Sequence, residues 1–85
     1  MKKIEKELGK IVHWYDKINV AVIRLSGKLS VGDRIKVKRH DSEFEETVSS
    51  MQLDHKDIAS GKKGQEIAVK FSNEGHDGAV VFKVE

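Results

Sequence analysis

The chain has 85 residues, the length of one domain, and contains no cysteine. Disulfide bridges, thiolate metal sites and cysteine nucleophiles are therefore excluded, and a small chain without disulfides favours a reducing, cytoplasmic setting. Sixteen Lys and Arg residues against 14 Asp and Glu residues leave a formal net charge of only +2. Any basic surface must therefore come from how the charges are distributed. Residues 1–8 are charged where a signal peptide needs an apolar segment, and no run approaches the ~18 apolar residues of a membrane span.

The N-terminal residues 1–8 have Ile4 and Leu8 four positions apart among Lys and Glu, with Gly9 following. This spacing predicts either a charged tail or one or two helical turns that end at the glycine. From Gly9 onward the apolar period changes to two, so residues 9–85 are predicted to form a β domain.

Short strands rich in β-branched or aromatic residues, separated by turn residues, are predicted along the rest of the chain. Residues 34–39 alternate between basic and apolar side chains, which indicates one core-facing and one solvent-facing side. Residues 44–53 change their apolar parity near Ser49 and Ser50, which predicts a β-bulge that bends the strand. The other strands are expected at residues 10–15, 18–25, 65–71 and 79–84, with a polar connection at 54–63. The pattern predicts an all-β fold, a single small closed β-barrel of about six strands.

The segment SGKLSVGDRI at residues 26–35 contains the pattern Gly-x-Leu-x-Val-Gly-Asp-x-Ile directly after a Val-rich strand. With the segments at 48–52, 64–69 and 77–81, it resembles the second, barrel-shaped domain of elongation factor Tu and related translation GTPases. The resemblance covers residues 9–84 and implies a barrel that Leu29 fills, with flanking glycines permitting tight turns. The sequence has no Gly-x-x-x-x-Gly-Lys-Ser/Thr phosphate loop, so the GTPase domain is absent.

Two further segments, KIVHWY at residues 10–15 and SMQLDHK at 50–56, resemble stand-alone translation elongation factor-like proteins. A similar barrel also occurs as a C-terminal appendage of some collagenase-like peptidases. The translation factors contact the acceptor end of tRNA with the help of neighbouring domains. The resemblance therefore implies the fold, and no individual binding residue is transferred from it.

The main candidate binding surface is a row of cations, Arg34, Lys36 and Lys38, on the outward side of one strand. Their spacing of roughly 6–7 Å is close to that of phosphates in single-stranded nucleic acid. A second interpretation stays open. If the chain turns back as a hairpin, Lys36 faces Glu45 and Lys38 faces Glu43, and these cross-strand pairs neutralise the row.

An exposed aromatic residue and further cations complete the predicted nucleic-acid-binding surface. Trp14 and Tyr15 lie on opposite sides of one strand, so one is expected in the core and the other exposed. An exposed ring would stack on a base, worth ~1–3 kcal/mol, and packing beneath a loop is the alternative. Lys62 and Lys63 either hold a phosphate within a glycine-flanked loop or form a solvated turn. The complete predicted set is Arg34, Lys36, Lys38, Lys10, Arg24, Trp14, Lys62 and Lys63.

The sequence predicts no catalytic, metal or cofactor site. The four histidines show no pair at i+2 or i+4, the spacing that a metal site would use. The acidic run is interpreted as a solvated charged face, because nothing encloses its carboxylates for acid–base chemistry. It consists of Asp41, Glu43, Glu45 and Glu46.

The sequence thus predicts a non-catalytic, cytoplasmic binding module that uses no membrane. The leading hypothesis is translation-associated binding of RNA or the ribosome through a barrel face. The alternative is a protein-interaction module that acts with a separate enzyme, such as a peptidase or a modifying enzyme. The oligomeric state stays open.

Overall fold

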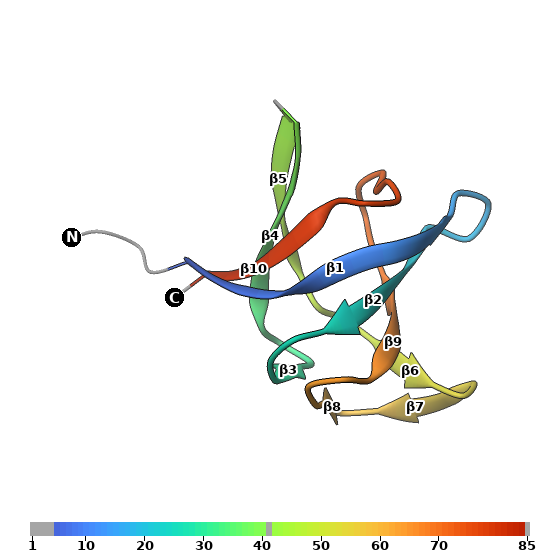
Figure 1. Cartoon of the computed structure of the whole chain (residues 1–85). Helices are drawn as coiled ribbons and strands as arrows, with labels where there is room; N and C mark the ends of the chain where they lie inside the picture. Colours follow the sequence, from blue (N-terminus) through green and yellow to red (C-terminus); the bar gives the residue numbers. More distant parts are fainter. Residues whose placement is uncertain (1–4, 41, 85) are drawn as a thin grey trace.

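The computed structural model describes residues 5–40 and 42–84, and within them the chain forms strands and turns without a helix (Figure 1). Ten strands are present, several of them only two or three residues long. They are β1 (Glu5–Tyr15), β2 (Val20–Leu25), β3 (Leu29–Ser30), β4 (Arg34–Arg39), β5 (Ser42–Thr47), β6 (Met51–Leu53), β7 (Lys56–Ile58), β8 (Ser60–Gly61), β9 (Glu66–Lys70) and β10 (Val80–Val84).

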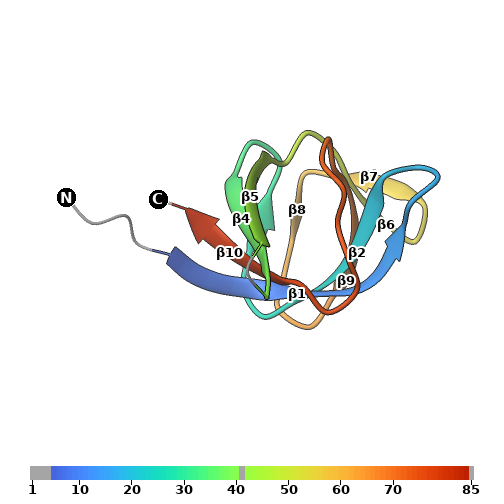
Figure 2. The same cartoon turned by 90° about the horizontal axis from the view of Figure 1, so that it is seen from above.

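Eight of the strands form one antiparallel sheet in the order β5-β4-β10-β1-β2-β9-β6-β7, and β3 pairs separately with β8. Seen from above, the strands curl around a common interior (Figure 2). The order has two ends, β5 and β7, and no pairing between these two strands closes the sheet. The all-β class is therefore confirmed, whereas the closed barrel is not.

The core is built from the inward-facing side chains of the alternating strands. Ile35 and Val37 of β4 and Ile67 and Val69 of β9 are buried in this way. Leu29 of the short strand β3 is fully buried as well, as the sequence predicts. Each such side chain contributes about 1.5–3 kcal/mol by leaving water, so the interior is the main source of stability.

Strand β1 contains two register shifts, one between Glu7 and Gly9 and one between Ile11 and His13. At the second shift the extra residue changes the alternation, as a β-bulge does. As a result Trp14 packs against the core while Tyr15 is 47% exposed. The question that the sequence left open about these two aromatic residues is thereby settled.

Three local predictions differ from the structure. Residues 5–8 belong to β1, so they are neither helix nor free tail, and residues 1–4 lie outside the described residues. The predicted strand at 44–53 is divided into β5 and β6, because residues 48–50 pair with neither neighbour as strand; the parity changes through this break instead of through a bulge. The connection at 54–63 contains β7 and β8.

Candidate functional site

The predicted basic strand forms a hairpin with the acidic strand that follows it. Arg34 of β4 lies opposite Thr47 of β5, and its guanidinium donates to Glu45 Oε1 at 3.1 Å and to Thr47 Oγ1 at 2.9 Å. Arg34 is thus fixed by two acceptors on the neighbouring strand. A guanidinium held in this way has fewer donors left for a phosphate.

The two lysines of β4 are paired as well. Lys36 lies opposite Glu45 and Lys38 lies opposite Glu43, which is the register of the hairpin interpretation. The ammonium groups are 4.0 and 3.8 Å from the Glu43 carboxylate, and Lys36 is only 16% exposed. Lys38 also lies 5.1 Å from the centre of the Phe82 ring. The hairpin pairing is confirmed, and the row of cations is neutralised by its acidic neighbours.

Three of the predicted cations share one row across the sheet. Lys38 of β4 is opposite Val80 of β10, which is opposite Lys10 of β1, which in turn is opposite Arg24 of β2. The row continues to Glu66 of β9, whose carboxylate is 3.5 Å from the Arg24 guanidinium. The apolar Val80 separates Lys38 from Lys10, and Glu66 occupies Arg24, so this row is no continuous cationic track.

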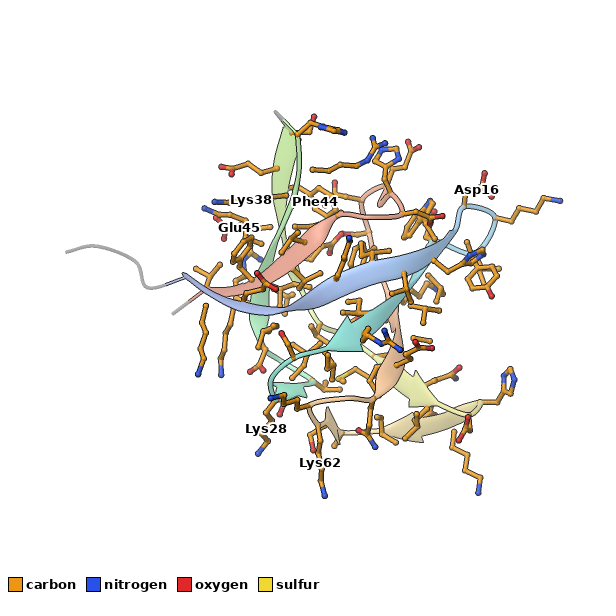
Figure 3. All side chains as sticks on the ribbon, viewed as in Figure 1. Asp16, Lys28, Lys38, Phe44, Glu45 and Lys62 are labelled. Atoms are coloured by element: carbon orange, nitrogen blue, oxygen red, sulfur yellow. The ribbon has the colours of Figure 1, made fainter. Side chains whose placement is uncertain are left out.

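Of the remaining predicted cations, Lys62 lies at a different end of the molecule, and Lys63 directly follows it in the chain. Leu29 of β3 pairs with Gly61 of β8, which brings the residues flanking them, Lys28 and Lys62, to the same end. In Figure 3 both lysines extend away from the ribbon there, far from Lys38. The eight predicted residues are therefore divided among separate surfaces, and their binding of nucleic acid stays a prediction.

Trp14 is enclosed by the loop at residues 72–79. Its ring is 5.7 Å from the Phe71 ring, and a Cβ added at Gly75 would lie 2.9 Å from it. Its backbone N–H donates to Asp77 Oδ1 at 2.6 Å, and its indole Nε1 is buried without a hydrogen-bond partner among the described residues. The packing alternative thus describes Trp14 better than an exposed stacking platform does.

Glu46 is a buried carboxylate, 5% exposed, that the sequence interpretation placed on a solvated face. Its oxygens accept hydrogen bonds at 2.7–3.1 Å from the backbone N–H groups of Ser72 and Asn73, the Ser72 hydroxyl and the Asn73 amide. The interpretation was wrong for this residue. The alternation of the strand did indicate a core-facing position for Glu46, because Glu46 shares its parity with Phe44 and Val48.

A second surface, which the sequence reasoning did not single out, lies on the outer side of β1, β2, β9 and β6. It is a groove of ≈ 480 Å³, called here the Tyr15 groove. Its apolar part consists of Tyr15, Ile18, Val20, Val22 and Ala68. Ile18 is 59% exposed in the turn between β1 and β2, whereas the sequence pattern placed it at the start of a strand.

The polar part of the Tyr15 groove comes from strand ends and a tight turn. It consists of Gln52, Asp54, His55 and Glu66. Asp54 and Glu66 are carboxylates, so the groove combines an apolar wall with an acidic border. Such a border favours cationic groups in a bound molecule.

Neither a metal site nor a membrane-crossing helix occurs in the described part of the chain. Residues 5–40 and 42–84 bring together no three His, Asp or Glu side chains able to hold a metal ion. The same residues contain no helix long and apolar enough to cross a membrane.

The chain is similar to proteins that are named as peptidases. A curated protein of Methanocaldococcus jannaschii, named as an uncharacterized protease, is 38% identical over 77 residues, which make up 89% of this chain. The chain spans only 19% of that relative's length. No protein-family profile matches the chain.

The solved structures with a similar fold also come from a protein that is named as a peptidase. Two structures of the C-terminal domain of a Geobacillus thermoleovorans protein, named as a U32 peptidase, superpose with TM-scores of 0.84 and 0.85. They cover 89% and 92% of this chain and 96% and 91% of theirs, at 9% and 10% sequence identity. At such low identity the likeness shows the fold alone. The identification as a translation elongation factor-like protein was wrong, since the similarities found are to a protease and to a peptidase domain.

Proposed function

We propose that this chain is a non-catalytic protein-interaction domain that acts together with a peptidase. The observation that carries the proposal is the 38% identity to a protease over most of this chain but only 19% of the protease. Most of that relative lies outside the similar segment. An auxiliary domain, joined to or associated with a separate catalytic part, is the arrangement that fits these proportions.

The side chains of the described residues support a binding role over a catalytic one. Glu46, the buried carboxylate, is engaged by Ser72 and Asn73, so it has no free oxygen aimed at a substrate. The sequence has no cysteine to act as a nucleophile. The Tyr15 groove instead exposes aromatic and aliphatic side chains, which are common at the centres of protein interfaces.

The experiment uses the Methanocaldococcus jannaschii protease with the similar 77-residue segment removed. We expect the truncated protease to lose hydrolysis of labelled casein, and a fusion to this chain to restore it. This chain alone is expected not to cleave casein. The matched control is the same fusion carrying Ile23→Asp, which places a charge at a fully buried position and should prevent folding.

Two results would contradict the proposal. One is casein cleavage by the purified 85-residue chain alone. The other is a truncated protease that retains full activity and gains nothing from the fusion, because the domain would then contribute nothing to a peptidase.

A further inference from the structure

We propose that the Tyr15 groove binds an extended segment of a partner protein in which an aliphatic side chain is followed, two positions later, by Lys or Arg. This inference rests on the proposed protein-interaction function and names the surface and the chemistry of its partner.

The groove exposes apolar surface that folding has left uncovered. Tyr15 and Ile18 are about half exposed or more, although buried positions of the same strands are filled by aliphatic side chains. They lie above Val20, Val22 and Ala68, which are half-buried and belong to adjacent strands β2 and β9. Contiguous exposed apolar side chains of this kind mark interaction sites more often than isolated ones do.

The charged side chains of the groove indicate the sign of the charge that a partner should carry. Asp54 has no ion-pair or hydrogen-bond partner among the described residues, and Glu66 shares its charge with Arg24, which is outside the lining. No Lys or Arg lines the groove. A cationic side chain placed beside an apolar one therefore complements both parts of the surface.

The acidic border is held in a fixed and unusual backbone conformation. Asp54 and His55 form the two-residue turn between β6 and β7, with φ of 51° and 66°. Such a turn requires positive φ at both positions and favours Asn-Gly or Asp-Gly. Retaining a histidine in place of glycine keeps an imidazole at the groove at the expense of local strain, and such strain is concentrated at functional positions.

The Tyr15 side chain of the groove is supported by a neighbouring ring. The Tyr15 ring lies 4.2 Å from the His13 ring, centre to centre, on the outer side of β1. A ring supported in this way loses little conformational freedom when a partner binds. Tyr15 is therefore suited to contact the aliphatic side chain of the segment.

The size of the groove favours a short segment over a second copy of this chain. A volume of ≈ 480 Å³ lies in the range of ligand-sized clefts, roughly 300–1,000 Å³. A stable dimer needs about 800 Å² of contact on each partner, which extends well beyond one such groove. The segment is read by two side chains on one side of an extended backbone, since residues i and i+2 face the same way.

The test is an NMR titration of the ¹⁵N-labelled chain with three capped pentapeptides. The cationic apolar probe is acetyl-Gly-Leu-Ser-Lys-Gly-amide, and the controls replace its Lys with Glu or its Leu with Ser. We expect amide shifts centred on Tyr15, Ile18, Asp54 and His55, with the Lys probe binding about fivefold more tightly than the Glu probe. The Ser-for-Leu probe should bind at least as weakly as the Glu probe.

Matched variants tie the binding to the groove. Ile18→Ser should weaken binding of the Lys probe about fivefold, whereas Val31→Ser, at the other large exposed aliphatic position in a turn, should leave it unchanged. Asp54→Asn removes the charge and keeps a residue that tolerates positive φ, and should weaken binding about threefold.

Equal binding of the Lys and Glu probes, or shifts centred outside the groove, would overturn the inference. Groove resonances that move on dilution without peptide would also overturn it, in favour of a second copy as the occupant. Fusion of the groove variants to the truncated protease separates the two proposals. If the wild-type fusion and the Ile18→Ser fusion restore protease activity equally, only the proposed role of the groove is contradicted. If the wild-type fusion does not restore activity, the proposed function is contradicted.

Discussion

Two surfaces of this domain differ in whether their side chains already have partners within the domain. On the β4–β5 hairpin, the paired face made of Arg34, Lys36, Lys38, Glu43 and Glu45 satisfies its charges within the domain. In the Tyr15 groove, the aromatic and aliphatic side chains are exposed and the border carries carboxylates without a cation in the lining. The first surface is rich in charge and already partnered, and the second is poor in charge and open.

The number of cations on a strand is therefore a weak guide to whether that strand binds a phosphate. An exposed ion pair contributes only about 0–1 kcal/mol to stability, but it still lowers the local field that would attract a phosphate. An open apolar patch has the larger free energy still to gain when a partner covers it. We therefore expect the hairpin to contribute to stability and the groove to contribute to binding.

The largest effect is expected at the buried carboxylate of the hairpin. Glu46→Ala removes the acceptor of the hydrogen bonds from Ser72 and Asn73, which leaves their N–H groups unsatisfied. The free energy of unfolding should fall by about 3 kcal/mol. Urea unfolding followed by the fluorescence of Trp14, the single tryptophan, measures it. Glu43→Ala is the control and should cost less than about 1 kcal/mol; equal losses would mean that Glu46 does not secure the loop.

The next effect concerns the paired face itself. The double variant Lys36→Glu and Lys38→Glu places like charges opposite Glu45 and Glu43, so unfolding should become about 1–2 kcal/mol easier. Adding Glu43→Lys returns an opposite charge to the position that both lysines approach, keeps the Arg34–Glu45 pair and should restore part of the loss. The loss should shrink at ~1 M salt because exposed charges are screened. Binding of the Lys probe to the groove should not change, and a change there would contradict the separation of the two surfaces.

A smaller effect of opposite sign is expected at the border of the groove. His55→Gly relieves a histidine held at φ 66° and should stabilise the fold by about 0.5–1 kcal/mol. His55→Ala retains a Cβ and should bring no such gain. If His55 contributes to the groove, the glycine variant should bind the Lys probe more weakly although it is more stable. A glycine variant that is both more stable and an equally good binder would show that the histidine has no part in binding.

The sequence predicts the hairpin better than it predicts the groove, and the reason is physical. Local alternation and turn residues determine β4 and its register with β5, because these depend on neighbours close along the chain, whereas the burial of Leu29 was implied by the family resemblance. The inward position of Glu46 was also available from parity, but its partners Ser72 and Asn73 are 26 and 27 residues away. Such distant contacts are not set by local pattern.

The groove could not be assembled from the sequence for the same reason. Its residues come from β1, the β1–β2 turn, β2, β6, the β6–β7 turn and β9, which are brought together only by the sheet order. The bulge in β1, which sends Tyr15 outward, depends on the pairing of β1 with β2. The resemblance to translation factors indicated an all-β domain correctly, but a fold shared by many functions does not identify the partner.

The smallest effect is expected from the Arg24–Glu66 ion pair beside the groove. Arg24→Gln should change the free energy of unfolding by less than about 0.5 kcal/mol, because the pair with Glu66 is well exposed. It also frees the Glu66 carboxylate in the groove, so the Lys probe should bind about twofold more tightly. Lys10→Gln is the matched control, since Lys10 lies opposite Arg24 in the same row, removes the same net charge and does not line the groove. If both variants strengthen binding equally, the probe responds to the net charge of the domain; if only Arg24→Gln does, it responds to the carboxylate that the groove itself presents.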